Sequence, residues 1–162
     1  MTPNDLYITE DGSYGICITN AAWNQIAEAC LKSKEKETGG VLIGSYSADQ
    51  SYAVISEVYM PTNSKSGRFW FNRGKSGLKK YLKECWNSIP RKYYLGEWHY
   101  HPVFEVEPSS QDLEQMKVVS NNSRYACNTP IMLIAGKSSS KNMPLKGWVF
   151  PKGKVIEFKE LF

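Results

Sequence analysis

Residues 93–102 read Tyr93-Tyr94-Leu95-Gly96-Glu97-Trp98-His99-Tyr100-His101-Pro102. This run predicts a central β-strand over residues 93–100, and Pro102 stops it because proline has no backbone N–H to donate. The chain contains two histidines in all, and both lie in this stretch. Residues two apart on a strand face the same side, so His99 and His101 should project together while Trp98 and Tyr100 face the other side.

Two imidazoles that converge on one spot suit a borderline-soft cation such as Zn²⁺. A lone histidine is better explained as an exposed or satisfied ring, but here the whole histidine supply of the chain is paired on one strand face. Asp112, one loop downstream, is the candidate third ligand. Three protein ligands leave a fourth tetrahedral position for water, which is typical of a catalytic zinc site.

Asp112 also has a purely structural interpretation. Ser109-x-x-Asp112 has the Ser-x-x-acid form of a capping box that opens a helix. Taken alone, the pattern favours capping over metal binding. The two interpretations are compatible, because a capped helix start fixes an adjacent carboxylate rigidly.

Hydrolysis at such a site needs a proton carrier, and spacing alone leaves several candidates. Glu37 lies just before Gly39-Gly40 and a predicted buried strand, so the chain could place it at a sheet end, although an exposed carboxylate is the simpler interpretation. Glu97, Glu105 and Glu107 are alternatives because they lie near the histidines in sequence. Glu97 shares the strand face of the histidines and could be a ligand or could orient one.

Around the central strand, hydrophobic periodicity predicts interspersed helices and strands. Asn20 stands where a helix N-cap would, ahead of an apolar series that includes Leu31 and ends near residues 34–36. A second helix over 76–87 should turn Trp86 inward, and Phe69-Trp70-Phe71 reads as a short strand. Further helices and strands are expected over 6–9, 13–19, 41–44, 52–60, 110–119, 131–135, 147–150 and 155–158. The predicted class is α/β (or α+β), a mixed β-sheet flanked by helices.

Length and composition limit the class of protein. With 162 residues, 41% hydrophobic and 22% charged, the chain should fold as one globular domain spanning residues 1–162. The net charge of +4 is spread over scattered lysines, several of them on the helix predicted over 76–87, and a solvated surface explains them better than an anion-binding patch. We find neither a dense basic stripe nor a nucleic-acid-binding module, so no nucleic acid partner is expected.

The sequence also predicts a cytoplasmic location. The N-terminus lacks the basic start and apolar stretch of a signal peptide, and no apolar run is long enough to cross a bilayer, so no membrane association is expected. The four cysteines form no CxxC pair and should be buried free thiols. They are Cys17, Cys30, Cys85 and Cys127.

Glu37 before Gly-Gly-Val-Leu-Ile-Gly, then His99-x-His101-Pro102, seven residues, and Ser109-x-x-Asp112 together resemble the JAMM motif of the JAB/MPN metalloproteases. The fixed seven-residue spacing makes the second half of the motif specific, and the predicted elements fit the compact JAB domain, whose fold is related to that of the cytidine deaminases. The resemblance implies zinc held by His99, His101 and Asp112.

The resemblance also assigns the two catalytic roles. Glu37 would be the general base that takes a proton from water and returns it to the leaving amine. Ser109 would donate a hydrogen bond to the oxyanion, which is compatible with capping. Family members usually carry Ser or Thr where this chain has Tyr100, which should face away from the metal and so leave ligation intact.

Family members mostly cleave peptide or isopeptide bonds after the C-terminal tail of ubiquitin or a ubiquitin-like protein. The phrase over residues 96–102 looks more like bacterial stand-alone members, above all the JAB deconjugases of CBASS antiphage operons. Those act beside an E1/E2-like ligase and remove a nucleotidyltransferase (CD-NTase) joined through its C-terminus to a target. The resemblance therefore implies a deubiquitinase-like isopeptidase in antiviral defence.

Two other functions fit the sequence less well. A non-catalytic JAB module that binds or scaffolds a partner usually lacks one or more ligands, and this chain lacks none of them. A cytidine-deaminase-like enzyme would require H-x-E with P-C-x-x-C, and the chain has no CxxC.

Overall fold

The computed structural model describes residues 4–138 and 143–159. Three α-helices are found in this part of the chain, α1 (Asn20–Ser33), α2 (Leu78–Asn87) and α3 (Ser110–Asn121), with short 3-10 helices η1 (Ser123–Tyr125) and η2 (Pro151–Gly153). The strands of the main sheet are β1 (Leu6–Ile8), β2 (Gly15–Ile18), β3 (Thr38–Tyr46), β4 (Tyr52–Tyr59), β7 (Tyr93–Tyr100), β8 (Ile131–Ala135), β9 (Leu145–Val149) and β10 (Ile156–Glu157). A separate hairpin consists of β5 (Lys65–Ser66) and β6 (Phe71–Asn72).

The main sheet has the strand order β1-β2-β4-β3-β7-β8-β9-β10. The pairs β2–β4 and β7–β8 are parallel, and the other pairs are antiparallel, so the mixed sheet predicted from the sequence is confirmed. The strand predicted over residues 93–100 is β7, and it lies inside the sheet between β3 and β8.

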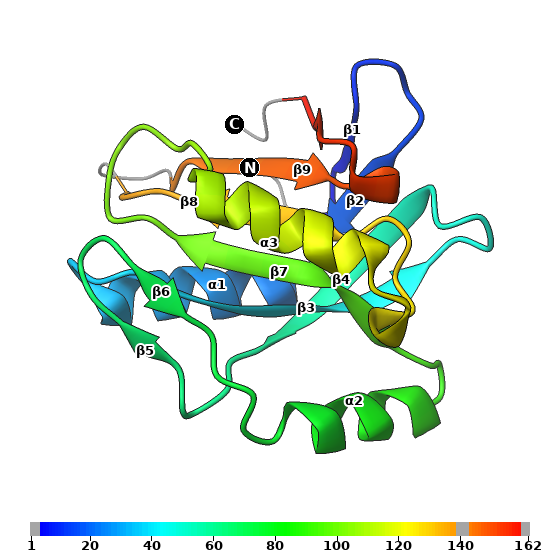
Figure 1. Ribbon diagram of the computed structural model, residues 1–162, viewed down its shortest axis with the longest axis horizontal. Coiled ribbons are helices and arrows are strands. Elements are labelled where there is room, and N and C mark those ends of the chain that lie inside the picture. Colours follow the sequence, from blue (N-terminus) through cyan, green and yellow to red (C-terminus); the bar gives the residue numbers. More distant parts are fainter. Residues whose placement is uncertain (1–3, 139–142, 160–162) are drawn as a thin grey trace.

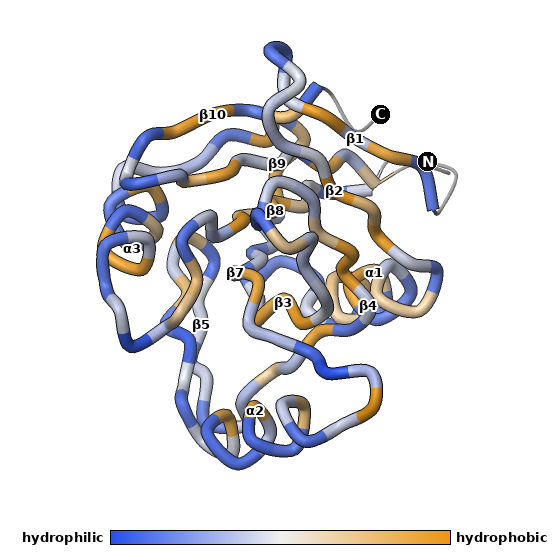
Figure 2. Tube along the Cα trace, turned by 90° about the vertical axis from the view of Figure 1, so that its right-hand side faces the viewer, coloured by the Kyte–Doolittle hydropathy of each residue, from blue (hydrophilic) through white to orange (hydrophobic). Residues whose placement is uncertain are grey.

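The sheet curls until its two edge strands meet. An isolated antiparallel bridge joins Thr9, just after β1, to Phe158, just after β10, and the backbone N–H of Lys159 donates to the Ile8 carbonyl at 3.0 Å. Figure 2 shows β1 and β10 at the same edge of the molecule. The backbone of each edge strand therefore gains partners near the seam, which protects it from pairing with another chain.

Helices cover both faces of this sheet, and the strands alternate between the two cores. Leu42 of β3 belongs to the core beneath α1, whereas its neighbours Val41 and Ile43 pack with α2 on the other face. On β8, Leu133 faces α1 while Met132 belongs to the core of α3. This is the period of two expected of strands buried on both sides. Figure 1 shows α1 and α3 on opposite sides of β7.

A bulge at Gly96 sets which residues of β7 face each side. The β3–β7 register shifts between Leu42 and Ile43, opposite this glycine, whose φ is +146°. A Cβ at position 96 would stand 1.8 Å from the Ile131 carbonyl oxygen, so the strand tolerates no side chain there. After the bulge, Trp98 and Tyr100 enter the α1 core, and His99 takes the opposite face.

Four details of the expected elements are wrong. The N-cap of α1 is Thr19, whose hydroxyl accepts from the Ala22 N–H, so Asn20 is already helical. Leu31 is exposed on α1, and Trp86 of α2 faces outward, where its ring contacts Tyr93 and Arg91. Phe69 and Trp70 form the exposed tip of the β5–β6 hairpin instead of a strand, because the Gly67 N–H donates to the Trp70 carbonyl and turns the chain.

The cysteine prediction is confirmed in most respects. All four thiols are free, and Cys30, Cys85 and Cys127 are buried, whereas Cys17 is partly exposed on β2. Among the described residues, none of the helices combines the length and apolar character that crossing a membrane requires.

Candidate metal centre and active site

The two histidines lie where β7 ends. His99 is the penultimate residue of β7, and His101 directly follows it, its backbone N–H still donating to the Ala135 carbonyl at 2.9 Å. Trp98 and Tyr100 are buried on the opposite face, as the alternation of the sequence predicts. Both imidazoles lie near Asp112 of α3, so they share the face of the sheet that this helix covers. Figure 1 shows α3 beside β7.

Asp112 reaches the histidines from the first turn of α3. It occupies the third helical position of a complete capping box, in which its backbone N–H donates to Ser109 Oγ at 3.1 Å and the Ser109 backbone N–H donates to its Oδ2 at 2.8 Å. Ser109 Oγ also donates to Oδ2 at 2.6 Å. The predicted helix cap is confirmed, and it fixes the carboxylate that faces the histidines.

The three side chains converge. His99 Nδ1 lies 2.8 Å from Asp112 Oδ1, and His101 Nε2 lies 3.7 Å from Asp112 Oδ2. One ligand atom of each residue lies within 4.8 Å of the other two. For comparison, ligand atoms about 2.1 Å from a tetrahedral ion lie about 3.4 Å from one another. The cluster thus has the dimensions of a zinc site with small adjustments of the side chains.

The protonation states of this cluster also fit a divalent cation. Burial lowers the pKa of His101 and keeps its ring neutral, the form that ligates metal, although the Asp112 charge opposes this. Burial would raise the pKa of Asp112, but hydrogen bonds from His99 and Ser109 and the His99 charge outweigh it and lower that pKa to about 2. Two imidazoles and one carboxylate form a donor set that zinc accepts.

Glu37 directly precedes β3, the strand that pairs with β7. Thr38 pairs with Tyr100 and Gly39 with His99, so one further step of this register sets Glu37 opposite His101. Burial raises the pKa of the Glu37 carboxyl to about 7, the Asp112 charge adds to this rise, and His99 opposes it. A half-buried carboxyl with a pKa near neutrality can both accept and return a proton.

Gly39 allows β3 to approach the site this closely. A Cβ at this position would lie 2.3 Å from the Trp98 carbonyl oxygen, 2.9 Å from a ring carbon of Phe71 and 3.0 Å from the His99 ring. The backbone oxygen cannot move aside without parting the two strands. Gly39 is therefore required by the contact between β3 and β7.

The other candidate carboxylates lie elsewhere. Glu97 is completely buried on the same face as His99, but its oxygens are engaged by Arg73, Gln115 and Tyr94. Glu105 is exposed in the loop after His101, and the exposed Glu107 forms an ion pair with Lys146. The charges of Asp112 and His99 act on the pKa of the Glu37 carboxyl, which agrees with a position of Glu37 beside the cluster.

The β5–β6 hairpin covers one side of the cluster. The Phe71 ring meets the His99 ring edge-on, with 5.6 Å between centroids. Beside it a cleft of about 450 Å³ opens between the hairpin and α3, lined by Trp70 and Phe71 on one side and by Gln111 and Gln115 on the other. The cleft adjoins the cluster through Phe71, whose ring contacts His99, and through Gln111, the residue before Asp112.

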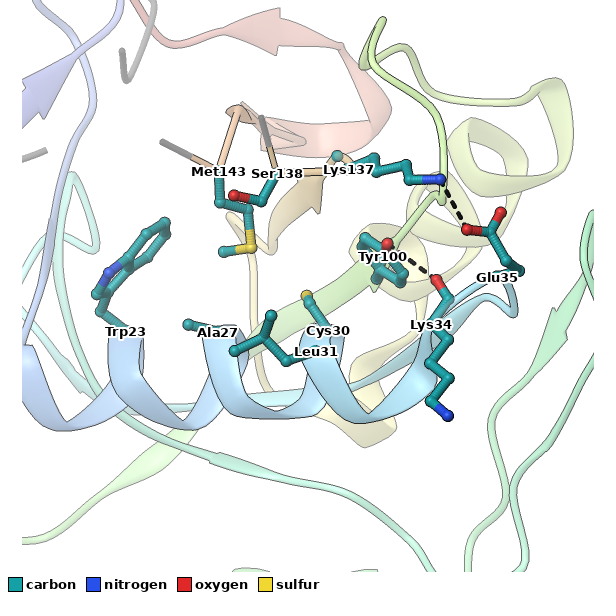
Figure 3. A pocket seen from close by; sticks show the side chains of 11 residues that line it. Trp23, Ala27, Cys30, Leu31, Lys34, Glu35, Tyr100, Lys137, Ser138 and Met143 are labelled. Carbon is teal, nitrogen blue, oxygen red and sulfur yellow. Dashed lines mark hydrogen bonds and ion pairs between the residues drawn. The ribbon is translucent and has the colours of Figure 1, made fainter. Parts of the chain in front are cut away.

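A larger cavity of about 600 Å³ lies on the opposite face of β7, against Tyr100. Figure 3 shows its wall of α1 residues, the Tyr100 hydroxyl donating to the Lys34 carbonyl at 3.1 Å, and the ion pair of Lys137 with Glu35 at its rim. The described residues that line it include no group of potential metal ligands, and its one carboxylate is held by the lysine. The cluster of His99, His101 and Asp112 therefore lies outside this larger cavity.

Sequence reasoning missed three residues around the cluster: Phe71, Arg73 and Gln115. Gln115 could have been found, because it follows Asp112 by three residues and so shares its helical face. The places of Phe71 and Arg73 depend on the path of the hairpin, for which the sequence carries no periodic signal.

Comparison with known proteins agrees with this geometry. The family profile described as "Prokaryotic homologs of the JAB domain" matches residues 19–149, which include the whole cluster. The chain belongs to the prokaryotic JAB family. A solved structure with the same fold, protein DSY2949 from Desulfitobacterium hafniense, superposes with a TM-score of 0.62 over 90% of each chain at 20% identity. That likeness concerns the fold alone.

This JAB-family chain is also similar to a functionally described protein. It is 39% identical over 155 residues to a "CD-NTase/cGAS isopeptidase" of Enterobacter hormaechei subsp. hoffmannii, a match that covers 94% of this chain and 85% of that protein. The resemblance to bacterial JAB proteins that deconjugate nucleotidyltransferases is therefore confirmed at the level of sequence.

Proposed function

We propose that the chain is a zinc-dependent isopeptidase that releases a CD-NTase or cGAS-like protein from a target to which it is joined through its C-terminus. The observation that carries the chemistry is the convergence of His99, His101 and Asp112 within 4.8 Å at the end of β7. The substrate class rests on the 39% identical isopeptidase. The four free cysteines fit action in a reducing compartment such as the cytoplasm.

In this proposal the three ligands hold one zinc ion, which when bound polarises the scissile carbonyl and makes water acidic enough to attack near neutral pH. Glu37 accepts a proton from the attacking water as the oxygen–carbon bond forms. The carbon–nitrogen bond then breaks, and Glu37 returns the proton to the leaving amine. Its pKa of about 7 suits both steps.

Ser109 has two roles in the proposed mechanism, as the helix cap of α3 and as a hydrogen-bond donor to the substrate. Its backbone N–H donates to Asp112 Oδ2 at 2.8 Å, so that carboxylate keeps one anchor when the Ser109 hydroxyl exchanges its own bond to Oδ2 for one to the substrate. In the tetrahedral adduct Ser109 Oγ donates to the oxygen that carries the developing charge. The helix cap and the oxyanion donor are thus successive states of one side chain.

The test uses a CD-NTase joined by an amide bond from its C-terminal carboxylate to a lysine of a carrier protein. We expect wild-type protein to release the two partners, to stop after treatment with a chelator and to resume when zinc is added. Glu37→Gln should lower the rate by about 10²–10⁴-fold, the usual contribution of a general acid–base. Glu114→Gln, which changes an exposed glutamate of α3, serves as the matched control.

Two outcomes would overturn the proposal. Cleavage that continues undiminished under chelation excludes zinc chemistry. Binding of the CD-NTase without cleavage, at equal affinity before and after chelation, indicates a binding or scaffold module in place of an enzyme.

A further inference from the structure

A second buried carboxylate, besides that of Asp112, lies close to the candidate metal centre. Glu97 is on β7 two residues before His99, and none of its surface is exposed. Its Oε1 accepts from Arg73 Nη2 at 2.8 Å and from the Tyr94 hydroxyl at 3.3 Å, and its Oε2 accepts from Gln115 Nε2 at 3.0 Å. Both oxygens therefore accept hydrogen bonds from residues outside the metal cluster, and Glu97 is not among the three side chains that converge.

The three partners of Glu97 come from three segments that meet at the metal centre. Tyr94 belongs to β7, the strand of His99. Gln115 is on α3, three residues after the candidate ligand Asp112 and on the same helical face. Arg73 directly follows β6. One carboxylate thus joins the strand, the helix and the hairpin that surround the cluster.

The β5–β6 hairpin, which Arg73 ties to Glu97, also contacts two residues of the site. Phe71, two residues before Arg73, places its ring 5.6 Å from the His99 ring. At the other end of the hairpin, the Gly67 carbonyl accepts a hydrogen bond from the Glu37 backbone N–H at 2.8 Å. If the hairpin moves, the Glu37 backbone loses its partner and His99 loses the ring packed against its edge.

The chemistry of the pair makes this attachment firm. The side chains of Arg73 and Glu97 are 7% and 1% exposed, so neither charge can be solvated if the other is removed. A buried ion pair is seldom the best device for stability alone, because well-packed apolar residues often serve as well or better. The hydrogen bond between an arginine and a carboxylate also requires a defined relative orientation, so the pair fixes how the two segments lie against each other.

We infer that Glu97 and Arg73 are positioning residues, and that their buried ion pair holds the β5–β6 hairpin against β7 and α3 so that Glu37 and the metal ligands keep one arrangement. The inference rests on the proposed function for its catalytic meaning. Its structural content, the dependence of the hairpin on the pair, does not.

The experiment compares Glu97→Gln with Glu57→Gln as a matched control. Glu57 of β4 forms a partly exposed ion pair with Lys92, the residue before β7, at 2.9 Å, and Lys92 is not a partner of Glu97. Two quantities are measured for each variant: the exchange rate of the Glu37 amide proton in chelator-treated protein, and the zinc dissociation constant from competition with a chromophoric chelator.

We expect Glu97→Gln to speed exchange of the Glu37 amide by about tenfold or more, because the hairpin that accepts its hydrogen bond opens more often. We expect it to weaken zinc binding by about 10–100-fold, the usual effect of removing a group that orients metal ligands. Glu57→Gln should change neither quantity by more than about twofold.

The double variant Arg73→Met/Glu97→Gln separates positioning from stability. It leaves no buried charge unpaired, so its melting temperature should recover towards that of the wild type. We expect zinc binding to remain weaker, and exchange of the Glu37 amide proton to remain faster, than in the wild type. Recovery of both together with the melting temperature would show that the pair is only structural and would overturn the inference.

The two proposals can fail separately. Unchanged exchange of the Glu37 amide in chelator-treated Glu97→Gln overturns the inference whatever the enzyme does. A wild-type protein that binds no zinc overturns the proposed function, while the exchange measurement still decides whether the pair holds the hairpin.

Discussion

Replacing Ser109 by alanine removes a hydroxyl that makes two contacts with Asp112. Ser109 Oγ accepts from the Asp112 backbone N–H at 3.1 Å and donates to Asp112 Oδ2 at 2.6 Å. The bond from the Ser109 backbone N–H to Oδ2, at 2.8 Å, survives the substitution. The helix therefore loses its side-chain cap, while the carboxylate keeps one of its anchors and its contact with His99.

The cost to stability follows from the lost cap. A serine N-cap replaced by alanine lowers the free energy of unfolding by about 1 kcal/mol, whereas glycine at the same place costs only a few tenths. For a chain of this length about 1 kcal/mol corresponds to a fall of about 2–4 °C in melting temperature. Ser109→Ala should thus melt measurably lower than Ser109→Gly.

The cost to catalysis should not follow the same order. Both substitutions remove the hydroxyl that we propose as oxyanion donor, so both should lower kcat by about 10²–10³-fold with little change in KM. The assay is cleavage of the CD-NTase conjugate, and melting temperature and zinc content are measured on the same preparations. We expect both variants to retain zinc, because the ligands are untouched.

Ser109→Gly gives the decisive comparison. If it is nearly as active as the wild type while Ser109→Ala is impaired, the hydroxyl acts only as a cap and the oxyanion role is wrong. If glycine costs as much stability as alanine, the reasoning about the cap is wrong instead.

Three further predictions concern the surroundings of the site. Tyr100→Phe removes one hydrogen bond, to the Lys34 carbonyl at 3.1 Å on the face away from the metal. It should lower the free energy of unfolding by about 1 kcal/mol and leave the zinc content unchanged. Loss of zinc in elemental analysis would contradict this position of Tyr100. Gly39→Ala puts a Cβ 2.3 Å from a backbone oxygen of β7, so cleavage should fall sharply and the melting temperature with it; a variant with wild-type rate and melting temperature would exclude the close contact of the two strands. Burial raises the pKa of the Cys30 thiol to about 12, which leaves almost no thiolate near pH 8. Iodoacetamide should therefore label the partly exposed Cys17 of the native protein well before Cys30. Peptide mapping that finds Cys30 labelled first would refute its buried position.

The sequence foretold the elements that depend on local pattern. The strand over residues 93–100 was predicted to the residue, because aromatic and apolar side chains fill both of its faces until Pro102 ends it. The capping box at Ser109 could also be predicted from the sequence, because it depends on two residues three apart. The expected convergence of His99, His101 and Asp112 rested on these two local features together with the resemblance to the JAMM motif.

What the sequence could not foretell depends on contacts between distant segments. Arg73 lies 24 residues from Glu97, and the two meet only because a short hairpin folds back over β7. Trp86 satisfies the helical spacing of an inward residue, but its ring is exposed. Figure 1 shows that α2 lies at the edge of the molecule. The phase of β7 likewise depends on the bulge at Gly96, which the partner strands define.

In the proposed function, His99, His101 and Asp112 together hold one zinc ion. An anomalous difference map, collected at the zinc absorption edge from crystals of protein produced with ample zinc, tests it most directly. We predict a single strong peak within bonding distance of all three side chains, about 2.0–2.2 Å from each ligand atom. An empty map at this position, or a peak bound by other residues, would contradict the claim.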